Sequence, residues 1–196
     1  MIQVGITTKG DKQARQKLAD VQQHLQHPRR PMAESGKYVS VTVRRHFLAL
    51  DSRGNARGWP SRHFHLREGR DKTALTSVTD TEAVVSIASI PMLHRLLGGV
   101  VVPKRAKSLA IPLSAKAYAV GSPRNWEDGD GRLFRPKGRS ILVQADPNHP
   151  GSLLLHYALR KRVTHRPHPE VIPPMEPIGR KILEIHQKHL QRELAR

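Results

Sequence analysis

The chain has 196 residues, enough for one domain with its own hydrophobic core and one elaborated segment. It holds 34 Lys and Arg against 16 Asp and Glu, and this net charge of +18 favours contact with nucleic acid, an anionic surface or an acidic partner. The lack of cysteine excludes disulfides and thiolate metal sites. No apolar run reaches the roughly 20 residues of a membrane helix, and the first residues lack a signal-peptide layout. We therefore expect a protein used without secretion and without membrane contact.

The first part of the chain is predicted to be largely helical. Residues 2–6 alternate apolar with smaller side chains and indicate an edge strand. Apolar stripes at intervals of three and four predict helices over residues 11–27 and 32–50. Gly36 is expected to weaken the second helix by about 1 kcal/mol relative to Ala. Residues 62–65 are compatible with a short strand or a helical turn, and the pattern does not decide between them.

Short apolar runs rich in β-branched residues follow. Residues 82–90 are predicted as a strand, and residues 92–97 as one or two helical turns that end at Gly98. Four further strands are predicted over residues 100–102, 109–113, 141–144 and 153–163. The prolines between residues 167 and 177 indicate a stiff, extended connector. A last apolar stripe predicts a helix over residues 178–195.

Together these elements predict an α+β fold, in which N-terminal helices and a C-terminal helix pack on a small antiparallel β-sheet. Residues 1–97 form the predicted helix-helix-strand core of a single domain. Residues 98–166 form a basic, β-rich insert that completes the sheet and projects a long β-hairpin towards neighbouring molecules. Residues 167–196 form the Pro-rich connector and the last helix. The large side chains predicted to anchor the core are Phe47, Trp59 and Phe134.

The positive charge is concentrated in the insert. Residues 98–166 hold 13 basic and 4 acidic residues, whereas residues 1–97 hold 16 and 8. Three clusters supply the candidate DNA-facing or subunit-interface residues: Lys104, Arg105, Lys107; Arg135, Lys137, Arg139; and Arg160, Lys161, Arg162. Such clusters suit phosphate contacts, whose affinity falls steeply with salt, and equally suit salt bridges to an acidic subunit. Base-specific readout is not expected, because helix-turn-helix and zinc-finger spacings are absent.

Twelve histidines require a metal site to be considered. The candidate ligand pairs by spacing are His63 with His65, His165 with His168, and His186 with His189. The chain lacks a His-Glu-x-x-His motif, and neighbouring arginines would repel a cation. It also lacks a Gly-x-Ser-x-Gly motif and a cysteine nucleophile. We expect no enzyme, no metal and no cofactor, and a metal-dependent hydrolase is the least favoured hypothesis.

A series of short motifs runs through the chain in order. They are Arg45-His46-Phe47, Gly58-Trp59, Val84-Val85-Ser86-Ile87, Gly98-Gly99, Pro-Lys-x-x-Lys-x-Leu-x-Ile-Pro over residues 103–112, Leu133-Phe134, and Leu159-Arg160-Lys161-x-Val163. Over most of residues 10–196 this order resembles the tail-completion and virion-morphogenesis proteins of tailed bacteriophages, including the Mu-like tail-completion protein and the lambda-type minor tail protein Z. Residues 171–175 depart from the family pattern, because they read Val-Ile-Pro-Pro-Met where the family usually has a Pro-Phe pair.

The resemblance implies a structural, non-catalytic virion protein that completes the tail or joins it to the head. Members of the family commonly form a ring of six subunits. It therefore implies a homo-oligomer around the DNA channel, in contact with other neck, connector and tail proteins. The implied location is the virion, and the host cytoplasm during assembly. The alternative, based on charge alone, is a nonspecific nucleic-acid-binding accessory protein.

Overall fold

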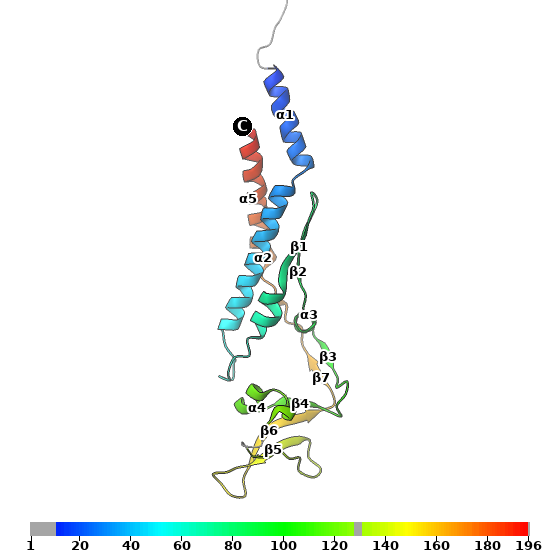
Figure 1. Cartoon of the computed structure of the whole chain (residues 1–196), viewed down its shortest axis with the longest axis vertical. Coiled ribbons are helices and arrows are strands. Elements are labelled where there is room, and N and C mark those ends of the chain that lie inside the picture. The colour runs from blue at the N-terminus through cyan, green and yellow to red at the C-terminus, as the bar shows by residue number, and fades with distance from the viewer. Residues whose placement is uncertain (1–10, 128–130, 196) are drawn as a thin grey trace, which may run out of the picture. The chain divides into compact units, whose positions relative to one another are not determined.

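The computed structural model describes residues 11–127 and 131–195 and has an α+β fold, as predicted (Figure 1). Its α-helices are α1 (Asp11–Gln26), α2 (Arg29–Ser52), α3 (Ile90–Leu97), α4 (Ala115–Val120) and α5 (Met175–Leu194). Its strands are β1 (Thr73–Val78), β2 (Ala83–Ile87), β3 (Gly99–Val101), β4 (Leu109–Pro112), β5 (Ile141–Ala145), β6 (Leu153–Arg160) and β7 (Val163–His165). The strand predicted over residues 2–6 lies outside the described residues.

The chain divides into two compact units. The described residues of the first unit are 11–46, 72–88 and 173–195. The second unit consists of residues 47–71 and 89–172. Each unit is assembled from separate stretches of the chain. Among the described helices, none is long and apolar enough to cross a membrane.

In the first unit, α1 runs alongside α5, and β1 pairs antiparallel with β2. Gly36 lies where α2 approaches this hairpin most closely: a Cβ there would lie 2.6 Å from Cδ1 of Leu75 and 3.0 Å from Cβ of Ala83. The close approach explains why the helix contains a residue of low helix propensity. His189 of α5 lies 2.7 Å from the carboxylate of Glu34 in α2, and this hydrogen bond lowers the pKa of Glu34.

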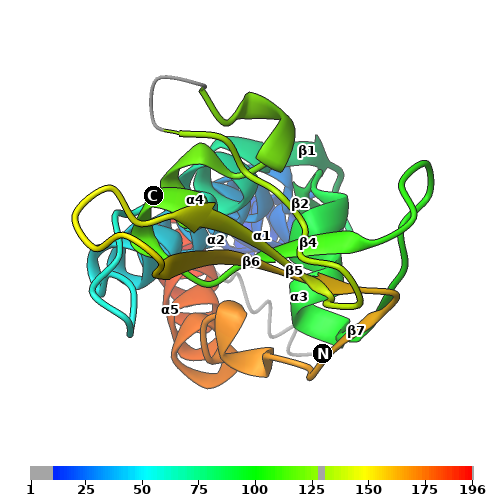
Figure 2. The same cartoon turned by 90° about the horizontal axis from the view of Figure 1, so that it is seen from below.

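The second unit holds two antiparallel sheets. Strand β3 pairs with β7, and strands β4, β6 and β5 lie side by side in that order (Figure 2). Tyr157 and Val143 of the larger sheet are buried together with Ala117 of α4. The single long hairpin predicted for residues 98–166 is thus not confirmed. One reason is that the run predicted as a strand over residues 153–163 is divided between β6 and β7, which belong to different sheets.

The predicted core anchors have different environments. Phe47 is fully buried, and its ring lies against the backbone of Gly69, where a Cβ would approach the ring atom Cγ to 2.5 Å. Trp59 is half-buried. Phe134 is 41 % exposed, so it does not anchor the core. Its backbone forms only an isolated bridge with Val143 of β5, and no regular strand holds its side chain towards the interior.

Several local boundaries differ from the predicted ones. Helix α5 begins at Met175, before the predicted start at residue 178, because Pro177 lies in the first turn, where a missing N–H removes no helical hydrogen bond. In the undecided segment, residues 62 and 63 are irregular, with a φ of +50° at His63, and a helical turn begins at Phe64 and continues as a π-helix over His65–Gly69. The connector includes a 3₁₀ turn at Pro169–Val171.

Candidate nucleic-acid interface

The three basic clusters converge at one end of the β4–β6–β5 sheet. Strand pairing places Leu109, at the start of β4, opposite Arg160, at the end of β6. It also places Ile141, at the start of β5, opposite Ala158 of β6. The loops that lead into β4 and β5 carry the first two clusters, and the end of β6 carries the third. Segments far apart in sequence therefore meet at a single surface.

We call this surface the basic end. Its members are Lys104, Arg105, Lys107, Arg135, Lys137, Arg139, Arg160, Lys161 and Arg162. All nine side chains are exposed, and within the described part of the chain none of them forms an ion pair. Like charges held close together without carboxylates repel one another, so the arrangement favours an external anion.

The loop before β5 has a defined shape although it is exposed. The Arg135 side chain donates from Nε to the carbonyl oxygen of Arg139 at 2.7 Å. The backbone N–H of Arg139 donates to the carbonyl oxygen of Pro136 at 3.1 Å. Gly138 completes the turn with a φ of +73°, which a side chain would disfavour. These contacts fix the direction in which the second cluster leaves the sheet.

The opposite end of the same sheet has a different character. It is formed by the turn over residues 146–152, drawn in yellow at the left of Figure 2, while the loop over residues 102–108 lies at the right in green. The Asp146 carboxylate accepts a hydrogen bond from the backbone N–H of Asn148 at 2.9 Å and lies 3.1 Å from Nδ1 of His149. The Asp146 carboxylate thus makes its contacts within its own turn. The acidic residue and the basic clusters therefore lie at opposite ends of the strands.

A row of stacked cations and aromatic rings was missed by the sequence analysis. The Arg57 guanidinium lies 4.8 Å from the ring centre of Trp59, and that ring lies 5.4 Å from the ring of Tyr118. The Arg62 guanidinium lies 5.7 Å from the Tyr118 ring. In the sequence, two arginines flank Gly-Trp-Pro and could have indicated this row, but Trp59 is predicted there only as an apolar core anchor. Both arginines are engaged with rings, unlike the cations of the basic end.

A Ser–His pair lies in the interior of the sheet. Ser114 caps α4: its Oγ accepts from the backbone N–H of Ala117 at 3.1 Å and shares a hydrogen bond with Nδ1 of His156 at 2.8 Å. Burial and, secondarily, the charge of Lys116 lower the pKa of His156.

His156 has the surroundings of a packed core histidine, because its side chain is buried. Nε2 of His156 is buried with no hydrogen-bond partner among the described atoms, and its ring packs against Trp126 at a centroid distance of 4.5 Å. The pair therefore stabilises the packing of α4 on β6.

The histidines considered as metal ligands contact carboxylates or an aromatic ring instead. His63 places Nδ1 at 2.7 Å from the carboxylate of Asp51, and the His65 ring stacks with Phe47 at 6.5 Å. His168 places Nδ1 at 2.8 Å from Glu170. Within residues 11–127 and 131–195, no three His, Asp or Glu side chains are placed to hold a metal ion.

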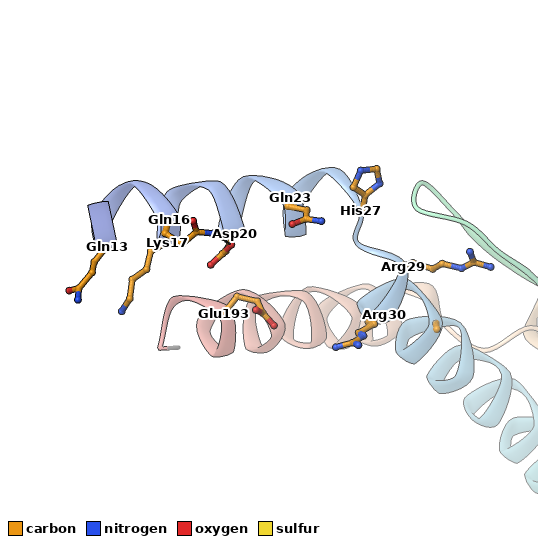
Figure 3. Close-up of a pocket in the computed structure, with 10 residues that line it drawn as sticks. Gln13, Gln16, Lys17, Asp20, Gln23, His27, Arg29, Arg30 and Glu193 are labelled. Atoms are coloured by element: carbon orange, nitrogen blue, oxygen red, sulfur yellow. Dashed lines mark hydrogen bonds between the residues drawn. The ribbon is translucent and has the colours of Figure 1, made fainter. Parts of the chain in front are cut away.

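A groove of about 1170 Å³ lies between α1, α5 and the start of α2 (Figure 3). Lys17 and Asp20 extend from α1 to the side on which α5 lies, whereas Arg29 points away. Asp20 and Glu193 of this groove balance part of its positive charge. It lacks both the uncompensated charge of the basic end and a cluster of apolar side chains, so it does not define a ligand.

Comparison with models of protein families, with curated proteins and with solved structures gave no match. The basic end is therefore interpreted from its own chemistry. It offers exposed, uncompensated ammonium and guanidinium groups on a sheet with a defined register, which is what phosphate contacts require.

Proposed function

We propose that this protein is a structural, non-catalytic virion component of a tailed phage, which completes the tail or joins it to the head as a homo-oligomeric ring around the DNA channel. Two observations support the proposal: the motif order that resembles the tail-completion proteins, and the basic end. The basic end is the physical argument for the proposal, because a ring that surrounds DNA places one charged surface of every subunit near phosphate groups. The protein would be found in the virion, and in the host cytoplasm during assembly.

The exposed apolar side chains of α1 support assembly into an oligomer. Leu18 and Leu25 of this helix are exposed, although the sequence places them on its apolar stripe. A helix of 16 residues is marginal in water unless an apolar face is buried. Neighbouring subunits or other neck and tail proteins would bury this face, and DNA would neutralise the basic end that otherwise opposes association.

Assembly is tested with the purified full chain, alone and mixed with isolated phage heads or tails. Light scattering is expected to give the mass of a closed oligomer, and negative-stain images are expected to show rings alone or at the head–tail junction. A protein that stays monomeric and binds neither heads nor tails would contradict the proposal.

The second candidate function is nonspecific nucleic-acid binding by the free monomer, which the basic end alone would support. The two functions are separated by electrophoretic titration of double-stranded DNA at several salt concentrations. Tight binding with a steep salt slope by a protein that remains monomeric favours the accessory role. Weak binding by the monomer that strengthens on ring formation favours the virion role, because a ring presents many copies of the basic end at once.

A further inference from the structure

The row of stacked cations and aromatic rings lies wholly within the second unit. The segment after α2 carries Arg57, Trp59 and Arg62, and α4 carries Tyr118. We call these four residues the aromatic row. Both arginines are exposed, and both rings are half-buried, so part of each ring is accessible from solvent.

The segment that carries Trp59 is held in place on both sides of this ring. Before it, the backbone N–H of Arg57 donates to the side-chain oxygen of Asn55 at 2.8 Å. After it, His63 has a φ of +50°, which is uncommon for a residue with a side chain, and its Nδ1 lies 2.7 Å from the Asp51 carboxylate. A ring that is held in advance loses little conformational entropy when a ligand binds.

The other half of the row is supported by α4. Ser114 caps the start of this helix through the backbone N–H of Ala117. Gly121 follows its last residue with a φ of +82°, and a Cβ there would lie 2.9 Å from Nη2 of Arg62. The Arg62 guanidinium therefore lies against backbone that only a glycine leaves uncovered. Its orientation is set by this contact and by the Tyr118 ring.

The two guanidinium groups keep their hydrogen-bond donors. Within residues 11–127 and 131–195, neither Arg57 nor Arg62 forms an ion pair or a side-chain hydrogen bond. A guanidinium stacks through its face, whereas its five N–H donors lie in its plane. The donors therefore remain available to phosphate oxygens, which a guanidinium can bind through two parallel hydrogen bonds.

We propose that the aromatic row binds single-stranded nucleic acid, with bases stacked against its rings and phosphate groups at the edges of its guanidinium groups. A single strand repeats a planar base and a phosphate at every nucleotide, and these are the two chemistries that the row can bind. In a duplex the bases are already stacked on one another, so they would have to leave the stack to reach the rings. The inference goes beyond the proposed function, because neither ring assembly nor duplex contact at the basic end requires an unstacked base.

The test uses the full chain and fluorescein-labelled strands of about 12 nucleotides, which is within the site sizes of single-strand-binding proteins. The probes are oligo-dT, oligo-rU, an abasic strand that keeps every phosphate but has no base, and a duplex of the same length. The test variants are W59L and R57Q/R62Q. The matched control R53Q/R67Q removes the same charge from exposed positions of the same unit. Anisotropy titration gives the affinities, and thermal unfolding checks that the variants fold.

We expect the wild type to bind oligo-dT or oligo-rU at least about tenfold more tightly than the abasic strand. W59L should abolish this preference, because it removes the aromatic face and keeps an apolar side chain. R57Q/R62Q should weaken binding of the base-bearing strands more than R53Q/R67Q does. The arginine variants change only exposed side chains, so their comparison decides the question even where W59L does not fold.

The duplex separates this inference from the proposed function. R57Q/R62Q and R53Q/R67Q should bind the duplex equally. Replacement of Arg160, Lys161 and Arg162 by Gln should weaken duplex binding and leave the preference for base-bearing strands unchanged. A loss at the basic end and a loss at the aromatic row are thus read from different probes.

Three results would overturn the inference. The first is a wild type that binds neither base-bearing strand more tightly than the abasic strand. The second is an unchanged preference in folded W59L. The third is an equal loss of affinity in R57Q/R62Q and R53Q/R67Q, which would reduce the row to general charge.

Discussion

Strand β6 contributes residues both to the interior of the β4–β6–β5 sheet and to the basic end. The polar side chains of these two regions have different environments. Strand β6 contributes His156 and Tyr157 to the interior, where Ser114 and Ala117 supply hydrogen bonds. Three residues further on, Arg160 is exposed without an ion pair among the described residues. Loss of a hydrogen-bond partner is costly for a buried polar group, whereas exposed cations tolerate isolation. We therefore expect interior substitutions to change stability and substitutions at the basic end to change binding.

The largest effect is expected at Tyr157, which is fully buried and donates its hydroxyl to the carbonyl oxygen of Ala117 at 3.2 Å. Tyr157→Ala should lower the free energy of unfolding by about 3–5 kcal/mol, because it leaves a cavity. Tyr157→Phe removes only the hydrogen bond and should cost about 1 kcal/mol. Urea unfolding measures both. Equal, small effects would mean that Tyr157 does not hold this interior together.

Neutralising the third cluster should leave stability unchanged and weaken DNA binding. Replacement of Arg160, Lys161 and Arg162 by Gln removes three phosphate contacts and should reduce the slope of log affinity against log salt by about 3. The matched control replaces Lys12, Lys17 and Lys188 by Gln, which removes the same charge from exposed helix positions elsewhere. If both triple variants lower the slope equally, net charge rather than the basic end determines binding.

Ser114→Ala should cost about 1–2 kcal/mol of unfolding free energy. The substitution removes the N-cap of α4 and leaves Nδ1 of His156 without its hydrogen-bond partner. Ser114→Thr keeps the hydroxyl and should recover most of the loss. Chemical denaturation of the three proteins at pH 7.5 provides the comparison, and a neutral Ser114→Ala substitution would contradict the assigned hydrogen bonds.

The free energy of unfolding should also fall in mild acid, because of a histidine in the interior of the sheet and not because of the basic end. The pKa of His156 is lowered from its ordinary value of 6.5, so the unfolded chain takes up this proton before the folded chain does. The contribution of His156 is complete above pH 6.5 and is lost as the pH falls from there towards the folded pKa. Unfolding measured between pH 8 and 5 should show this loss in the wild type and a smaller one in His156→Gln. Identical pH profiles would exclude His156 as the titrating group.

The smallest effect is expected at Phe134. Its side chain is exposed, so Phe134→Ser should change the unfolding free energy by no more than about 0.5 kcal/mol. Thermal unfolding measures this change, and the change measured in the same way for Tyr157→Phe serves as the reference. A loss above about 2 kcal/mol would restore Phe134 to the core that the sequence analysis assigned it to.

Elements that depend on local pattern were predictable from the sequence. The runs of β-branched residues before Gly and Pro marked β2 to β5, and the apolar stripe marked α2. Helix α4 was missed because its six residues are too short for a periodic signal, although Ser114 is a good N-cap. The pattern of residues 62–65 did not decide between a strand and a helical turn, because the π-helix that follows depends on the contact of Gly69 with Phe47, which is a tertiary effect.

The candidate site was predicted residue by residue but not as a surface. Each basic cluster is visible in the sequence, because three cations stand within a few positions. That they meet depends on β6 lying between β4 and β5, and this strand order is not encoded in any local pattern. The prediction that Phe134 anchors the core was wrong for a related reason, because the burial of Phe134 depends on whether the sheet extends beyond β5.

The central claim, that the basic end is the surface that contacts DNA, is tested most directly by lysine acetylation of the full chain with and without double-stranded DNA, read by mass spectrometry. The lysines Lys104, Lys107, Lys137 and Lys161 of the basic end should be protected by DNA. Lys12, Lys17 and Lys188, which are also exposed, should stay reactive. Equal protection of both groups, or protection of the second group alone, would contradict the account.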